Sequence, residues 1–186
     1  MEEEMGQMEG SKDGIAKKAF NLAEGYEKEC TGCAQTTIAG VFDALGVGND
    51  DVFKAASGLA DGLGLSGDGT CGALVGGAMV ISYLFGRERK DFKDMLKPMK
   101  SYLLAKKLHD QFVEKYGTCR CHDLQKSLMG RTFNLLDRTE FEEARKSDMM
   151  KHCSKIVGTT AKLATKIILE EWEKEEAKKR AGKASM

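Results

Sequence analysis

Apolar residues recur at helical spacing along most of the chain. The clearest stripe runs over residues 153–171, where apolar side chains return every three or four positions and therefore share one face of an α-helix. No segment shows the strict alternation of apolar and polar residues that is typical of a half-buried strand. Shorter stripes predict further helices over residues 15–26, 33–45, 50–56, 92–116 (broken or kinked at Pro98) and 121–129. The pattern predicts an all-α fold.

Residues 72–85 differ from the other predicted helices because they are apolar on nearly every side. A helix without a polar face is expected at the centre of a fold, away from water. We therefore predict a helical bundle built around this segment, with a long C-terminal helix. The preceding stretch, residues 58–72, holds six glycines, and a loop of this length and composition is usually functional or mobile.

Length and charge favour one soluble domain. We predict a disordered N-terminus over 1–12, a single helical domain over 13–178 and a disordered charged tail over 179–186. The 29 basic and 29 acidic residues cancel, which argues against nucleic acid as a partner. The longest apolar window, about 15 residues, is short for a membrane span, and the polar N-terminus does not resemble a signal peptide. We expect a cytoplasmic protein with no membrane span.

The six cysteines are the main candidates for chemistry. In a reducing compartment, clustered thiols indicate metal binding or redox chemistry more than structural disulfides. Cys33, Cys71 and Cys121 stand at predicted helix starts, where free N–H groups and the helix dipole favour the thiolate. Cys153 lies on the apolar face of the last helix. Four such cysteines could meet at one point in a bundle, although a single buried cysteine is most often just a small apolar residue.

Three other residues are weaker candidates. Cys30, Cys119 and His122 each stand close in sequence to one of the four cysteines and are kept as spare ligands. The glycines of residues 62–67 fit the dinucleotide fingerprint only by register, because no strand precedes them. The common hydrolase, P-loop and metalloprotease motifs are missing from the sequence, so whether the protein is an enzyme stays open.

Four segments together resemble a known family. They are GCAQTT (32–37), CGALVG (71–76), CHDLQKSLMG (121–130) and HCSKIVGTTA (152–161). Their order is similar to that in the largely uncharacterised family of redox-active proteins named for its C–GCAxxG–C–C pattern, over about residues 15–170. The resemblance implies that the family cysteines correspond to Cys33, Cys71, Cys121 and Cys153, with Cys30 and Cys119 as additions. Covalent haem is not expected, because the chain has no C-x-x-C-H motif.

Four functions follow as hypotheses. The first is an iron–sulfur cluster, held by Cys33, Cys71, Cys121 and Cys153, that transfers electrons to a redox partner protein or senses redox state. The second is thiol–disulfide exchange at the Cys30/Cys33 pair or at Cys71, with Cys33 and Cys71 as the redox thiols. The third is a structural zinc site with the same ligands, and the fourth is an interaction protein with buried cysteines and no cofactor. A homo-oligomer also stays open.

Overall fold

A computed structural model describes residues 10–184 of the protein. This part of the chain contains eight α-helices and no strand, so the predicted all-α fold is confirmed. A single isolated antiparallel bridge joins Thr70 to Arg120. The helices are α2 (Lys12–Cys30), α3 (Cys33–Leu45), α4 (Asp50–Ala55), α5 (Gly72–Phe85), α6 (Met99–Tyr116), α7 (Cys121–Met129), α8 (Arg138–Lys146) and α9 (Met149–Ala184), with 3-10 turns at Ser57–Leu59 and Arg89–Asp91.

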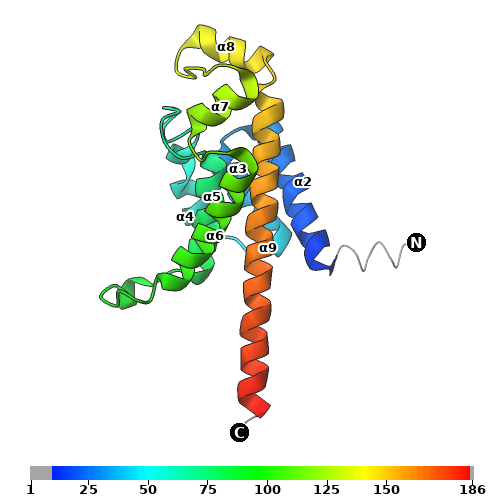
Figure 1. The fold of residues 1–186 in the computed structure, drawn as a ribbon, viewed down its shortest axis with the longest axis vertical. Coiled ribbons are helices and arrows are strands. Elements are labelled where there is room, and N and C mark those ends of the chain that lie inside the picture. The colour runs from blue at the N-terminus through cyan, green and yellow to red at the C-terminus, as the bar shows by residue number, and fades with distance from the viewer. Residues whose placement is uncertain (1–9, 185–186) are drawn as a thin grey trace, which may run out of the picture.

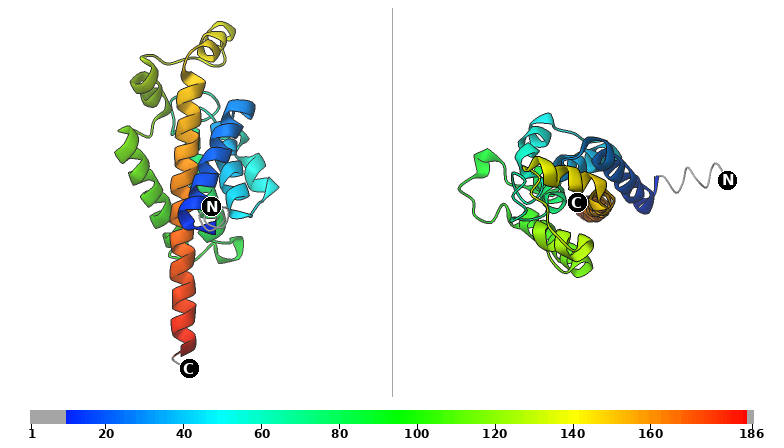
Figure 2. Two further views of the ribbon diagram at one scale, coloured as in Figure 1. Left: turned by 90° about the vertical axis from the view of Figure 1, so that its right-hand side faces the viewer. Right: turned by 90° about the horizontal axis from the view of Figure 1, so that it is seen from above.

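The long helix α9 forms the axis of the molecule. Helices α2, α3, α5 and α6 pack along its first half, while α7 and α8 lie at the end where α9 begins (Figure 1). The last turns of α9 extend beyond the other helices, as the two further views also show (Figure 2). None of the helices among residues 10–184 is both long and apolar enough to cross a membrane.

Helix α5 occupies the centre, as its apolar sequence predicts. It contacts α3, α6 and α9, and both Val80 and Ile81 are fully buried. The close packing depends on glycine, because a Cβ at position 76 would lie only 2.3 Å from the carbonyl oxygen of Ala34. The last turn departs from the expectation: Ser82 is exposed, and Tyr83 is 42% exposed although its ring contacts that of Phe42 in α3.

The predicted stripe over residues 92–116 is helical only from Met99 onward. Pro98 occupies the N-cap position of α6, where a residue without an N–H group costs no hydrogen bond. The preceding residues form a projecting loop, on which the apolar side chains of Phe92 and Met95 are 59% and 83% exposed. Helix α8 was not predicted from the sequence because it has few apolar residues. Its start is fixed by Asp137, whose side chain accepts hydrogen bonds from two backbone N–H groups.

The ends of the helical region lie further out than the predicted domain boundaries. Helix α2 begins at Lys12, where the Ser11 side chain caps it. Helix α9 continues to Ala184, although residues 179–186 were predicted to be disordered. This segment is rich in Lys, Ala and Arg, which are strong helix formers, and Arg180 pairs with Glu176 of the preceding turn. The remaining parts of both predicted disordered segments, residues 1–9 and 185–186, lie outside the described residues.

Candidate functional site

The glycine-rich loop before α5 folds back on itself. Asp61, Leu63 and Leu65 have positive φ angles, and so do the glycines between them. Backbone hydrogen bonds close the loop: the N–H of Gly67 donates to the Asp61 carbonyl at 2.7 Å, and the N–H of Gly69 donates to the Gly62 carbonyl at 3.0 Å. A left-handed conformation is unfavourable for aspartate and more so for leucine, so this backbone is held in place by its surroundings.

The loop is paired with the segment that enters α7. The N–H of Cys71 donates to the Cys119 carbonyl at 2.8 Å, and the N–H of Cys121 donates to the Gly69 carbonyl at 3.0 Å. On the outer side the Arg120 guanidinium pairs with the Asp68 carboxylate. These contacts bring the start of α5 beside the start of α7, and with them Cys71 beside Cys121.

Four helices contribute one cysteine each to this end of the bundle. Cys33 is the first residue of α3, Cys71 directly precedes α5, and Cys121 is the first residue of α7. Cys153 lies in the second turn of α9. The N-terminus of a helix carries partial positive charge and therefore favours the thiolate form of Cys33, Cys71 and Cys121. Four thiols thus approach one region from four directions in the fold.

Cys71 lies within electrostatic reach of the other three thiols. Burial raises the pKa of Cys71 to about 11. Burial also raises the pKa values of Cys33, Cys121 and Cys153, and the neighbouring thiolate of Cys71 raises each of them further. Nearby carboxylates act in the same direction. The four thiols are therefore protonated at neutral pH unless a cation joins them.

Gly72, the first glycine of the CGALVG segment, makes room for one of these thiols. A Cβ at Gly72 would lie 2.3 Å from the Cys33 sulfur and 2.8 Å from the Leu59 carbonyl oxygen. Any side chain at this position would push Cys33 away from the start of α5. Gly72 and Gly76 therefore let α3 and α5 approach closely enough for Cys33 and Cys71 to be neighbours.

Asp61 is a member of the site that the sequence did not predict. Its carboxylate is 7% exposed. The Oδ1 atom accepts from the Cys121 thiol at 2.9 Å and from Nε2 of Gln125 at 2.8 Å, and the Asp61 N–H donates to the Cys33 sulfur at 3.5 Å. Gln125 is held in turn by the N–H of Phe133, which donates to its Oε1 at 3.1 Å. The available sequence signal was an acidic residue directly before the run of alternating glycines and leucines in this loop.

Glu27 brings a second buried carboxylate to the same region. It projects from α2, is 5% exposed and accepts a hydrogen bond from the Thr36 hydroxyl at 2.6 Å. Burial raises the pKa of Glu27 to about 7, and the Thr36 hydrogen bond opposes this only in part. Its charge raises the pKa values of Cys33, Cys71 and Cys153, so it lies near three of the four thiols.

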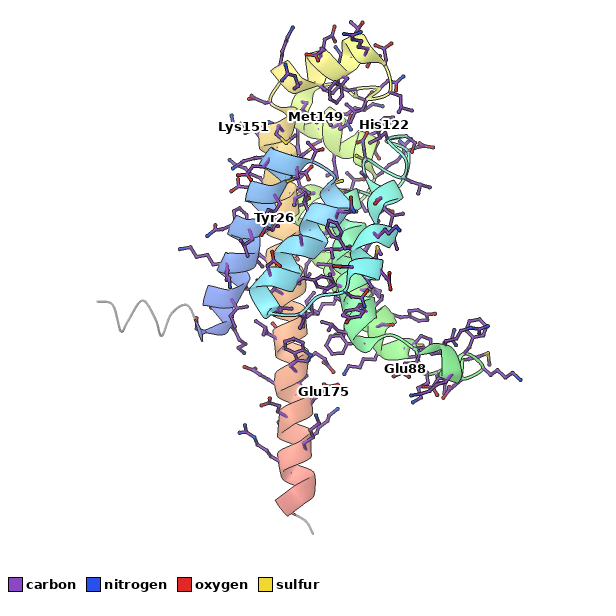
Figure 3. The ribbon with its side chains drawn as sticks, turned by 180° about the vertical axis from the view of Figure 1, so that it is seen from behind. Tyr26, Glu88, His122, Met149, Lys151 and Glu175 are labelled. Carbon is purple, nitrogen blue, oxygen red and sulfur yellow. The ribbon has the colours of Figure 1, made fainter. Side chains whose placement is uncertain are left out.

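The spare candidates lie around this group. Cys30 is exposed at the end of α2, and Cys119 is partly buried against the core. The His122 ring packs on the backbone of Gly67, where a Cβ would lie 1.8 Å from Nε2. Figure 3 shows His122 at the end of the molecule where α9 begins, near the labelled Met149 and Lys151.

All six cysteines are free thiols. Within residues 10–184, no three histidine, cysteine, aspartate or glutamate side chains already form a group that could hold a single metal ion. A metal ion or cluster bound by the four thiols would therefore have to draw the four sulfur atoms together. Their common location and their chemistry suit such a group, because buried cysteines are sulfur donors for iron and zinc.

Comparison with protein families places the chain. Residues 31–167, more than half of its length, match the model of a family described as "Putative redox-active protein (C_GCAxxG_C_C)". The protein belongs to this family. The family supports a redox role and confirms the resemblance found in the sequence. Comparison with curated proteins and with solved structures gave no significant match.

Proposed function

We propose that Cys33, Cys71, Cys121 and Cys153 hold an iron–sulfur cluster, with which the protein transfers electrons or senses redox state. Four cysteines are the usual ligand set of [2Fe–2S] and [4Fe–4S] clusters. The redox role of the family agrees with this use of the thiols. When bound, the cluster supplies one-electron chemistry that no side chain of the protein provides by itself.

The observation that carries the proposal is the electrostatic imbalance at this end of the bundle. Burial raises the pKa values of all four thiols, Cys71 raises those of the other three, and the carboxylates Asp61 and Glu27 add to the effect. Among the ion pairs formed within residues 10–184, none brings a lysine or arginine to either carboxylate. A bound cation deprotonates coordinating thiols outright, so cationic iron would stabilise the arrangement that the protein alone holds as neutral thiols.

The surrounding residues have defined tasks in this proposal. The N-termini of α3, α5 and α7 direct partial positive charge toward the thiolates. Gly72 allows Cys33 to approach Cys71, while the paired loops hold Cys71 beside Cys121. Cys71 and Cys121 are 6% and 7% exposed, so water has little access to these ligands.

Thiol–disulfide exchange is the second candidate, favoured by the proximity of Cys33 and Cys71. Oxidation of the two thiols would form one disulfide and pass two electrons and two protons to a disulfide-containing partner. The raised pKa values oppose this reaction, because the attacking species is the thiolate. A structural zinc ion would use the same four cysteines without redox chemistry.

The setting of the proposed function is a reducing compartment such as the cytoplasm, where six free thiols stay reduced. The electrons would be exchanged with a redox partner protein.

Single serine replacements test the ligand set. Protein should be produced and purified without oxygen, and its iron and acid-labile sulfide measured per chain. We expect Cys33→Ser, Cys71→Ser, Cys121→Ser and Cys153→Ser each to lose most of the iron. Cys30→Ser, a matched thiol only three residues from Cys33, should keep it. Equal losses in Cys30→Ser and Cys33→Ser would favour the C-x2-C pair instead, and zinc in place of iron would favour the structural site.

A further inference from the structure

Asp61 has a feature that its visible hydrogen bonds do not explain. Its Oδ1 accepts from Cys121 and Gln125, whereas its Oδ2 is buried and has no hydrogen-bond partner among residues 10–184. A buried acceptor without a partner is costly, and more so when the group is charged. Native proteins satisfy nearly all such atoms, so an exception calls for an explanation.

The position of Asp61 connects it to all four thiols. Its carboxylate contacts the Cys121 thiol directly, and its backbone N–H donates to the Cys33 sulfur. Its negative charge also raises the pKa values of Cys71 and Cys153. The Asp61 side chain, with its unpaired Oδ2, is therefore buried beside the thiols rather than exposed on the outer surface of the loop.

The backbone at Asp61 supports the same interpretation. Its φ angle of 47° is left-handed, a conformation in which glycine is favoured over aspartate. Glycine occupies the next position and several later positions of this loop, so glycine is an available solution for its left-handed backbone. Aspartate at position 61 instead places a carboxylate beside the four cysteine thiols, at the cost of backbone strain and of a buried charge.

We propose that Asp61 is a fifth ligand, which binds through its carboxylate to the metal centre held by the four cysteines. This inference rests on the proposed metal-binding function and names one further donor of that site. A carboxylate ligand beside thiolates gives one metal ion a harder donor than sulfur and distinguishes it from the others of a cluster. Binding would give the unpaired Oδ2 the cationic partner that the protein itself does not supply.

Asp61→Asn tests the assignment, because asparagine keeps the shape and can still accept from Cys121 and Gln125. The matched control is Asp68→Asn, an exposed aspartate in the same loop that pairs with Arg120. Each full-length variant is prepared without oxygen, and its iron content and thermal midpoint are measured before and after reconstitution with ferrous iron and sulfide.

We expect metal-free Asp61→Asn to melt at or above the midpoint of the wild type, because an unpaired buried charge is gone. After reconstitution it should bind iron at least tenfold more weakly and gain less stability, whereas Asp68→Asn should gain as much as the wild type. A purely structural role of Asp61 would lower both midpoints equally and would overturn the assignment. Should Asp61→Asn not fold, iron-edge X-ray absorption of the wild type decides, since a carboxylate ligand adds an oxygen scatterer at a shorter distance than sulfur.

The two proposals fail in different ways. Wild-type protein that takes up no iron overturns both of them. Wild type and Asp61→Asn that take up equal iron, with equal stabilisation and no oxygen scatterer, leave the four-cysteine site intact and overturn the fifth ligand alone.

Discussion

The two ends of the molecule handle charge in opposite ways. Away from the thiols, in the second half of α9, Lys107 pairs with Glu170 at 2.6 Å and Lys12 with Glu173 at 2.7 Å, and all four side chains remain in contact with solvent. At the thiol end, Asp61 and Glu27 are buried beside four thiols with no ion-pair partner among the residues described. Paired surface charges need no special explanation, whereas buried unpaired ones reduce stability and therefore indicate a functional site.

The largest effect that separates the two ends is expected from Glu27→Gln in metal-free protein. The folded pKa of Glu27 is about 7, above the ordinary value of 4.5, so the folded state binds this proton more tightly than the unfolded state. Stability from this group is complete below pH 4.5 and falls as the pH rises to about 7. Glutamine removes that loss, so above pH 7 the variant should be more stable by about 3 kcal/mol.

Denaturant unfolding at several pH values measures this difference. Glu173→Gln, at the solvated end of α9, serves as the control and should leave the pH dependence of unfolding unchanged. Parallel curves for the wild type and Glu27→Gln would show that Glu27 is not buried as the structure places it.

A smaller effect should distinguish two glycines of α9. A Cβ at Gly158 would lie 2.8 Å from the Phe20 carbonyl oxygen, whereas Gly182 has open space around it. Gly158→Ala should therefore lower the free energy of unfolding by about 1–3 kcal/mol through overpacking against α2. Gly182→Ala should raise it by at most about 1 kcal/mol, because alanine is the better helix former. Destabilisation of similar size at both positions would mean that the last turns of α9 are also packed.

The smallest effect should come from the ion pairs themselves. Lys107→Gln removes the partner of Glu170, and we expect a loss of less than about 1 kcal/mol because both side chains are partly solvated. Thermal melting with and without 1 M salt tests this, because at 1 M salt the Debye screening length is only about 3 Å and interactions between exposed charges are weak. A loss that persists in high salt would contradict the description of this end as solvated.

The sequence predicted those elements that have strong local signals. Helix α3 ends at Leu45, where Gly46 caps it, and α5 follows a glycine-rich loop, and the bounds of both match the predicted ones closely. Helix α8 was missed because a mostly polar helix has no apolar stripe to detect. The start of α6 was placed too early, because Phe92 and Met95 continue the apolar spacing on a loop that Pro98 separates from the helix.

The candidate site was accessible to sequence reasoning only in part. The family pattern singled out four cysteines, and the structure places Cys71 within electrostatic reach of the other three. Asp61 and Glu27 could not be found in this way. Asp61 meets Cys121 across 60 positions of sequence. Glu27 is one of several charged residues of α2, and nothing in the local sequence distinguishes it from those that face solvent.

The central claim is that the four thiols bind iron and sulfide. The most direct test is the visible absorption spectrum of wild-type protein purified without oxygen, together with its iron and acid-labile sulfide content. The account predicts a brown protein with both elements bound, which loses them in Cys71→Ser and keeps them in Cys30→Ser. A colourless wild type without iron, after reconstitution with ferrous iron and sulfide, would contradict it.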